Sequence, residues 1–209
     1  MKYEKQMESN IRVQPFTGNN VKRYIPEVAK LRIEVFREFP YLYDGNMEYE
    51  EKYLHTYTKS PESVIVIAFD HEDIIGASTA VPLIYETDEV KKPFIANNID
   101  PATVFYLGES VLLKSYRGHG IGVRFFQERE AHARQIGDFN WCAFCAVDRP
   151  NDHPRKPSSY VPLNEFWKKR GYSRHPELQT TFTWRDLDEA SESPKPMVFW
   201  LKAFKSLEK

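Results

Sequence analysis

The sequence predicts an α+β fold, in which a single domain forms around a mixed, mostly antiparallel twisted sheet of about seven strands flanked by about four helices. Three observations predict it: apolar runs of strand length occur near both ends of the chain, helical apolar spacing follows the first run, and residues 104–147 form the one strand–helix–strand unit. One such unit allows one parallel pair, so the other neighbours should be antiparallel. The 209 residues show neither a repeat nor a break in composition, so we expect a tail at 1–10 and one domain at 11–209.

The predicted elements follow the chain in order. Strands are expected at 11–16, at two segments around the turn DHED within 63–85, and at 104–114, 139–147, 179–187 and 195–204, and helices at 20–40, 47–57, 122–137 and 163–172. The first helix has apolar side chains at helical spacing from Val28 to Phe39 and should stop at the proline that follows. The third contains no proline and should stop at Gly137. Residues 88–103 and 148–162 are polar or rich in proline, so we expect irregular chain there, with room for a short helix in the first.

The second helix carries a stripe of tyrosines. Tyr49, Tyr53 and Tyr57 recur every four residues and therefore lie on one face of the helix. Packing explains such a stripe better than a ladder of ligand-binding groups. We therefore expect these rings to pack against the rest of the domain.

Composition excludes several classes of function. The net charge is −1, so no basic surface points to nucleic acid or to an anionic membrane. The first ten residues lack the apolar run of a secretory signal, and no segment reaches the roughly 18 apolar residues of a membrane span. We therefore expect a cytoplasmic protein.

Cys142 and Cys145 have the C-x-x-C spacing that redox and zinc sites use. They lie in a predicted strand, where residues three apart point to opposite faces of the sheet. The sequence has no second pair of cysteines. It therefore predicts two buried strand cysteines and no metal site.

Three of the nine glycines fall within the stretch YRGHGIG at 116–122. This stretch lies between a predicted strand and a predicted helix, where backbone amides can approach a phosphate. The P-loop string is absent, and the dinucleotide pattern fails in its glycine spacing and lacks a second strand–helix–strand half. A third pattern, Arg or Gln, two residues, Gly, one residue, then Gly or Ala, matches at Arg117, Gly120 and Gly122.

With these residues the chain resembles the GCN5-related N-acetyltransferase (GNAT) superfamily. The strand ESVLL precedes the loop, the strand CAFCAV follows the helix, and FWKKRGY at 166–172 is similar to the family's closing helix and turn. The resemblance covers nearly the whole chain and implies the acyl-CoA N-acyltransferase fold, an N-acetyltransferase activity and acetyl-CoA as cosubstrate. In this family the loop amides and the helix N-terminus hold the pyrophosphate of acetyl-CoA, because unpaired N–H groups and the helix dipole face the anion.

The resemblance implies a set of residues that bind acetyl-CoA. They are Val111, Leu112, Leu113, Arg117, Gly118, His119, Gly120, Ile121, Gly122 and Asn164. The three strand residues would offer backbone groups to the pantetheine arm, and the loop would hold the phosphates. Asn164 would either bond to the pantetheine or cap its own helix.

Glu109 is the candidate general base, because the family often uses a glutamate on this strand. Strand alternation places it on the face of Leu107, Val111 and Leu113. Burial among apolar side chains would favour proton acceptance. Two alternatives stay open: the carboxylate could pair with a nearby arginine or lysine, and a bulge could switch the face.

The general acid and the acceptor site are less defined. The family's usual tyrosine is replaced here by Trp167, which leaves Tyr160, Tyr172 or water to protonate the leaving thiolate. The resemblance places the acceptor among residues 36–46 and 148–160. The polar candidates there are Arg37, Tyr41, Tyr43, Asp44, Arg149, Asp152, His153 and Arg155.

The leading hypothesis is an N-acetyltransferase that moves the acetyl group by direct attack to a primary amine of a small molecule. The alternatives are a protein lysine or N-terminal acetyltransferase, a non-catalytic acyl-CoA-binding regulatory module, and a dinucleotide-binding oxidoreductase. A late strand such as MVFWLK could also pair across a homodimer.

Overall fold

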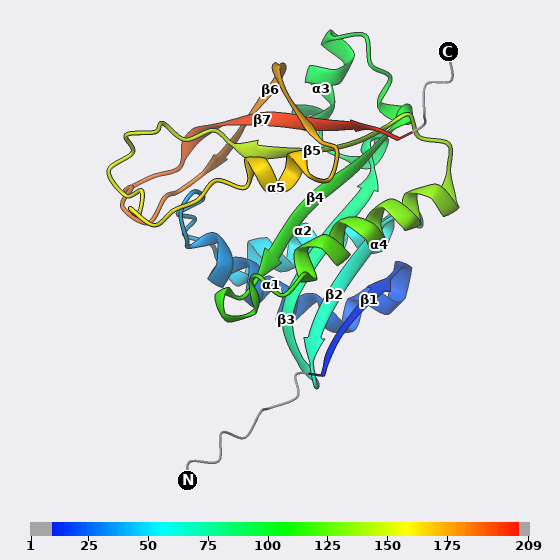
Figure 1. The fold of residues 1–209 in the computed structure, drawn as a ribbon, viewed down its shortest axis with the longest axis horizontal. Helices are drawn as coiled ribbons and strands as arrows, with labels where there is room; N and C mark the ends of the chain where they lie inside the picture. Colours follow the sequence, from blue (N-terminus) through cyan, green and yellow to red (C-terminus); the bar gives the residue numbers. More distant parts are fainter. Residues whose placement is uncertain (1–9, 205–209) are drawn as a thin grey trace.

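The computed structural model describes residues 10–204, so the predicted tail at 1–10 lies almost wholly outside the described residues. Seven strands form one sheet in the order β1-β2-β3-β4-β5-β7-β6 (Figure 1). The strands are β1 Ile11–Phe16, β2 Val64–Asp70, β3 Asp73–Pro82, β4 Val104–Leu112, β5 Trp141–Val147, β6 Ser173–Trp184 and β7 Ser193–Ala203. Only the pair β4 and β5 is parallel. The predicted fold class is therefore confirmed.

Helices cover both faces of the sheet. The α-helices are α1 Ile25–Phe36, α2 Met47–Lys59, α3 Asp88–Ala96, α4 Ile121–Ile136 and α5 Asn164–Lys168, and the 3-10 helices are η1 Gly18–Tyr24, η2 Leu83–Tyr85, η3 Pro101–Thr103 and η4 Lys114–Tyr116. In β2, Val66 packs with Phe125 of α4, and its neighbour Ile67 packs with Leu54 of α2. The period-two pattern of a strand thus gives one core under α4 and another under α1 and α2.

The first predicted helix is wrong in extent. The helix expected at 20–40 is the 3-10 helix η1 followed by α1, which begins beside Pro26 and ends at Phe36. Proline suits the first turn of a helix, where its missing N–H has no partner to lose. After α1, the amides of Tyr41 and Leu42 turn back to the carbonyl of Glu38. The short helix that the sequence allows within 88–103 is present as α3, which contains an internal proline.

β4 and β5 pair along a short stretch and then separate (Figure 1). Their register joins Val104–Tyr106 to Trp141–Ala143 and goes no further. β4 nevertheless stays paired with β3 as far as Leu112, and β5 stays paired with β7 as far as Val147. Within the described part of the chain, the edge of β4 beyond Tyr106 therefore has no strand partner on the β5 side.

A β-bulge interrupts β4 where it leaves β5. Ser78 of β3 lies opposite Ser110, but Ala80 lies opposite Leu107, so Thr79 faces two residues of β4, Gly108 and Glu109. A bulge shifts the strand by one residue and so exchanges its faces. Leu107 accordingly packs in the core under α4, whereas Val111 packs under α1 and α2. The expected common face for Leu107, Glu109 and Val111 is wrong for this reason.

Arg129 of α4 supports the bulge from one side. Its Nη1 donates to the carbonyls of Thr79 and Glu109, both at 3.2 Å, and its Nη2 donates to Ser110 Oγ at 2.9 Å. The side chain is buried, and burial lowers its pKa to about 10. Arg129 is therefore still a cation at neutral pH, and its planar fork satisfies carbonyls that the bulge removes from the strand ladder.

Replacing Arg129 should destabilise the fold. We expect Arg129→Met to lower the free energy of unfolding by about 2–4 kcal/mol, because buried carbonyls lose their donors. Urea unfolding measures this change. Arg124→Met is the matched control, since Arg124 lies on the same helix with its side chain 49% exposed, and it should stay within about 1 kcal/mol of the parent. Equal losses in the two variants would contradict the role of Arg129.

Candidate active site

The glycine loop between β4 and α4 has the geometry of an anion cradle. Gly118 and Gly120 have φ of +85° and +80°, a region that favours glycine. A side chain added at either position would meet no atom within 4 Å, so the space above the loop is open. The flanking bonds run from Arg117 N to Lys114 O and from Val123 N to Gly120 O. Among the described residues, the amides of 118–122 have no backbone acceptor.

The other loop side chains are already engaged or turned away. The Arg117 guanidinium holds Glu38 through two bonds of 2.8 and 2.9 Å and donates from Nε to Leu112 O at 3.1 Å. This arginine thus ties the loop to the turn after α1 rather than reaching outward. His119 is exposed, and Ile121 is buried in the core, so any phosphate contact of Ile121 would use its backbone.

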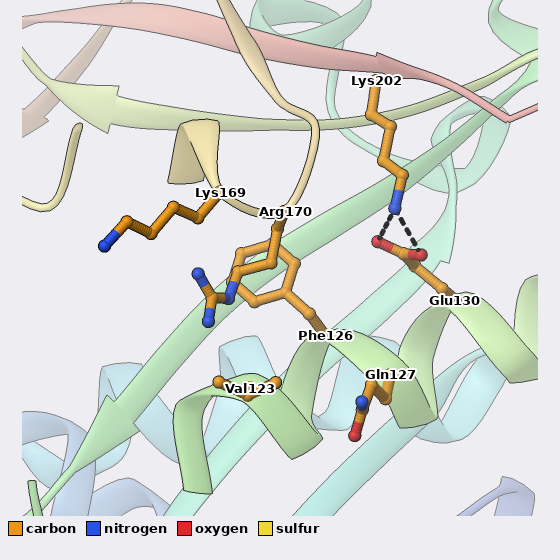
Figure 2. A pocket seen from close by; sticks show the side chains of 7 residues that line it. All are labelled: Val123, Phe126, Gln127, Glu130, Lys169, Arg170 and Lys202. Carbon is orange, nitrogen blue, oxygen red and sulfur yellow. Dashed lines mark hydrogen bonds and ion pairs between the residues drawn. The ribbon is translucent and has the colours of Figure 1, made fainter. Parts of the chain in front are cut away.

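A hollow of about 330 Å³ lies beside this loop, between α4, the end of α5 and β7 (Figure 2). Its lining residues are Val123, Phe126, Gln127, Glu130, Lys169, Arg170 and Lys202. Lys202 pairs with Glu130 at 2.8 Å. Among the described residues Lys169 and Arg170 form no ion pair within 4 Å, although the charge of Lys169 helps to lower the pKa of Glu165 and Arg170 donates to Phe166 O at 2.6 Å. Both still contribute positive charge to this hollow.

Glu109 points to the opposite face of the sheet, toward α1 and α2. Its Oε1 forms an ion pair with Arg32 of α1, and its Oε2 accepts a hydrogen bond of 3.2 Å from the hydroxyl of Tyr53 of α2. Arg32 also pairs with Glu50, which is fully buried. Burial opposes the charge of Arg32, but Glu109, Tyr53 and Glu50 outweigh it and raise the pKa of Arg32 well above its ordinary value. Pairing with an arginine was one of the alternatives left open for Glu109.

A second carboxylate, Glu86, lies near the same tyrosines, and the sequence did not single it out. Burial raises its pKa to about 7, and the charge of Glu109 adds to this effect. Its own charge in turn helps to raise the pKa of Tyr53, Tyr57 and Tyr106. Glu86 therefore belongs to the polar cluster on the α1–α2 face.

The candidates for general acid differ in their surroundings. Trp167 is a packing residue whose ring lies 5.1 Å from Phe144 and 5.0 Å from Trp200. The hydroxyl of Tyr172 donates to Glu130, on the α4 side. Tyr160 packs edge-on against Phe39 in the acceptor loops.

Asn164 is exposed and begins α5. The cap position belongs to Leu163, and no side chain caps the helix. Of the two roles weighed for Asn164, capping is thus wrong, and the pantetheine contact stays a prediction.

The two loops expected to frame the acceptor do meet. Arg149, which is almost buried, donates to the carbonyls of Pro40 and Tyr41 and to Asp186 Oδ1, each at 2.8 Å. Asp44 pairs with both Arg37 and Arg185. The His153 ring packs at a tilt against Phe39, and Arg155 pairs with Asp188. The segment that follows β6 thus also borders the expected acceptor site, which the sequence did not predict.

Both cysteines are buried in β5, as the sequence predicts. Cys142 packs in the core under α4, and Cys145 packs in the cluster on the other face, with the Tyr106 hydroxyl 3.1 Å from its sulfur. Burial raises the pKa of each thiol to about 12. Within residues 10–204, no three His, Cys, Asp or Glu side chains gather as metal ligands. Nor does that part contain a helix long and apolar enough to cross a bilayer.

Comparisons with known proteins define the class. Residues 28–156 match the family model described as the acetyltransferase (GNAT) family. The fold is similar to an N-acetyltransferase from Staphylococcus aureus Mu50 (TM-score 0.60, 11% identity, 94% of this chain and 100% of that chain). It is also similar to a ribosomal-protein-alanine N-acetyltransferase from Brucella melitensis (0.58, 10%, 92% and 99%). A third is the yncA protein of Salmonella typhimurium, solved with its cofactor acetyl-CoA (0.58, 5%, 95% and 96%).

The fold and the glycine loop thus define an acyltransferase of the acetyl-CoA-dependent class. More particularly, the chain belongs to the GNAT acetyltransferase family, because the matched segment exceeds half of its length. The resemblance recognised in the sequence is confirmed, and the dinucleotide-binding alternative is not supported. No curated protein sequence matches the chain. The comparisons therefore do not identify the acetyl acceptor, which has to be inferred from the chemistry of the site.

The glycine loop should lose acetyl-CoA when its backbone is strained. In Gly120→Ala, a side chain at positive φ costs about 1–2 kcal/mol and displaces the amides, so we expect binding to weaken about tenfold or more. Isothermal titration measures this. The control is Gly18→Ala, because Gly18 also has positive φ and open space but lies in η1. Both variants should lose similar stability, and equal loss of affinity in both would contradict the assignment.

Glu86 should make stability depend on pH. Its pKa in the folded chain is raised from the ordinary value of 4.5 to about 7, so its stabilising contribution is complete below about pH 4.5 and is lost as the pH rises through 7. Glu86→Gln should therefore be more stable than the parent at pH 8, by on the order of 1–3 kcal/mol, and not at pH 4.5. Urea unfolding at both pH values measures the difference. Glu72→Gln, at a fully accessible turn, should show none, and a pH-independent effect of Glu86→Gln would refute the prediction.

Proposed function

We propose that this chain transfers the acetyl group of acetyl-CoA by direct attack to a primary amine of a small molecule, with Glu109 as the base. The position of Glu109 carries the proposal. Its carboxylate lies at the bulge where β4 has left β5, on the face opposite α4. A donor held along β4 from the α4 side and an amine arriving from the α1–α2 side would meet at this gap.

The described residues fit acetyl-CoA, which supplies the activated acetyl group. The free edge of β4 offers N–H and C=O groups to the pantetheine arm, so Val111, Leu112 and Leu113 would contribute their backbone. The amides of 118–122 and the N-terminus of α4 suit the pyrophosphate. Lys169 and Arg170 add positive charge on the same side, where the nucleotide end of the molecule would lie.

The cluster around Glu109 suits an ammonium group. Arg32 is one cation shared by two carboxylates, Glu109 and Glu50, so the cluster has a net negative charge that attracts a cation. A base must be ionised before it can accept a proton, and the guanidinium of Arg32 is the opposite charge that lies beside this carboxylate. General-base catalysis of this kind contributes roughly 10²–10⁴-fold to rate.

A compact acceptor fits the far side of the gap better than a polypeptide. Arg149 joins the loop after β5 to the turn after α1 and to Asp186. These hydrogen bonds hold the loops in place, so the acceptor side of the gap is bordered by residues in fixed positions. A protein lysine or N-terminus is the alternative, and the similar Brucella protein acts on a ribosomal-protein alanine. A homodimer and a cytoplasmic location stay predictions from the sequence.

Labelled acetyl-CoA separates these functions. The purified protein should acetylate members of a panel of small primary amines and leave the proteins of a lysate unlabelled. Labelled protein with no small-molecule product would establish the alternative acceptor. Tight acetyl-CoA binding with no transfer to either class would indicate a regulatory acyl-CoA-binding module instead.

Glu109→Gln tests the base. We expect kcat to fall by about 10²-fold or more at pH 7 and to recover in part at high pH, where the amine loses its proton without help. Acetyl-CoA affinity should stay the same. Glu72→Gln is the control: it removes an exposed carboxylate outside the cluster, and it should keep the parental kcat and pH–rate profile. A parental profile for Glu109→Gln would exclude Glu109 as the base.

A further inference from the structure

Four hydrogen bonds form a ring that begins and ends at Glu109. The backbone N–H of Glu109 donates to Thr79 Oγ1 at 3.2 Å, and Thr79 Oγ1 donates to the Tyr57 hydroxyl at 3.0 Å. The Tyr57 and Tyr53 hydroxyls lie 3.0 Å apart, and Tyr53 donates to Glu109 Oε2 at 3.2 Å. The ring joins β3, β4 and α2.

The direction of this ring is fixed by counting protons. A carboxylate only accepts, so the single hydroxyl proton of Tyr53 goes to Glu109. Tyr53 must then accept from Tyr57, which accepts from Thr79. The ring cannot run backwards, because the amide of Glu109 has no lone pair to offer. A protonated Glu109 could still accept through its carbonyl oxygen, but a charged acceptor strengthens the bond.

The tyrosines are suited to act as donors. Burial, followed by the charge of Glu109, raises the pKa of Tyr53 and Tyr57 well above the ordinary value. Both hydroxyls therefore keep their protons across the working range of pH. The four residues in the ring come from three elements distant in sequence, so the fold itself brings them together.

Gly108 is an independent sign that the ring occupies this place. A side chain at Gly108 would lie 2.5 Å from Thr79 Oγ1 and 2.5 Å from the Tyr57 hydroxyl. Contacts this short do not occur, so any other residue at Gly108 would displace both groups. The glycine leaves the space that the ring fills, next to the bulge that carries Glu109.

We propose that Thr79, Tyr57 and Tyr53 are positioning residues, which close a one-way ring of hydrogen bonds on Glu109 and hold its carboxylate ionised at the gap between β4 and β5. This inference rests on the proposed role of Glu109 as the base. The ring fixes the side chain on Oε2, while Arg32 fixes it on Oε1. A base held in one place and one charge state needs no rearrangement before it accepts a proton.

Other charged and titratable groups also face Glu109. They are Arg32 of α1, Glu86 after η2, Tyr41 in the turn after α1, and Arg129 of α4. Substitutions confined to the ring leave all four in place. A change in pH dependence on removing one ring hydroxyl therefore reports the ring.

The pair Thr79→Val and Thr79→Ser tests the proposal. Valine keeps the shape of threonine without its hydroxyl, and serine keeps the hydroxyl. We expect Thr79→Val to move the acid limb of the kcat/KM profile up by about 1 pH unit, because the ionised form of the base loses support. Thr79→Ser should keep the parental profile. Tyr53→Phe should shift the limb in the same direction, with acetyl-CoA affinity unchanged in all three.

Controls separate the possible failures. Tyr116→Phe removes a tyrosine hydroxyl from a different carboxylate, Asp70, and should keep the parental acid limb. Identical profiles for Thr79→Val and Thr79→Ser would overturn the ring, even if Glu109→Gln had lost activity as proposed. A parental profile for Glu109→Gln would overturn the base itself. Tyr53→Phe guards against misfolding of the more buried Thr79 variants, because Tyr53 is only half-buried.

Discussion

The extra residue in β4 is the constraint on which the rest of the site depends. Because Thr79 faces both Gly108 and Glu109, the strand changes faces at the point where it parts from β5. Arg129 satisfies the carbonyls of Thr79 and Glu109 from the α4 side, and hydroxyls satisfy the amide and carboxylate of Glu109 from the α2 side. A single irregular position is thereby anchored by both layers of helices.

This arrangement divides the work between the two faces of the sheet. The α4 side has the open glycine loop and the positive charge of Lys169 and Arg170, which suit a phosphorylated donor. The α1–α2 side has an excess of carboxylate and a cluster of aromatic rings, which suit an ammonium group. The gap between β4 and β5 is the place where both sides are within reach of one strand. Charge of opposite sign therefore keeps donor and acceptor on their own sides.

The sequence carried enough information for the fold and the cofactor loop, because both depend on local signals. Alternation, helix spacing and three glycines in seven residues are visible without any tertiary contact. The face of Glu109 was not predictable, since the bulge depends on pairing with β3, thirty residues away. Arg32 was hidden among apolar neighbours in its helix, and Glu50 beside a tyrosine stripe. Their role is visible only in the folded chain, where the packing of α1 and α2 on β4 lets Arg32 pair with both Glu50 and Glu109.

The two cysteines have a practical consequence for biochemistry on this protein. Acetyl transfer releases the free thiol of CoA, which thiol-reactive dyes detect in solution. Cys142 and Cys145 are the chain's own thiols, both are buried, and burial raises the pKa of each to about 12. Since the thiolate is the reactive form, the folded protein should be silent toward such a dye. Colour that develops with enzyme, acetyl-CoA and an amine then counts turnovers directly, and colour from enzyme alone reports unfolding.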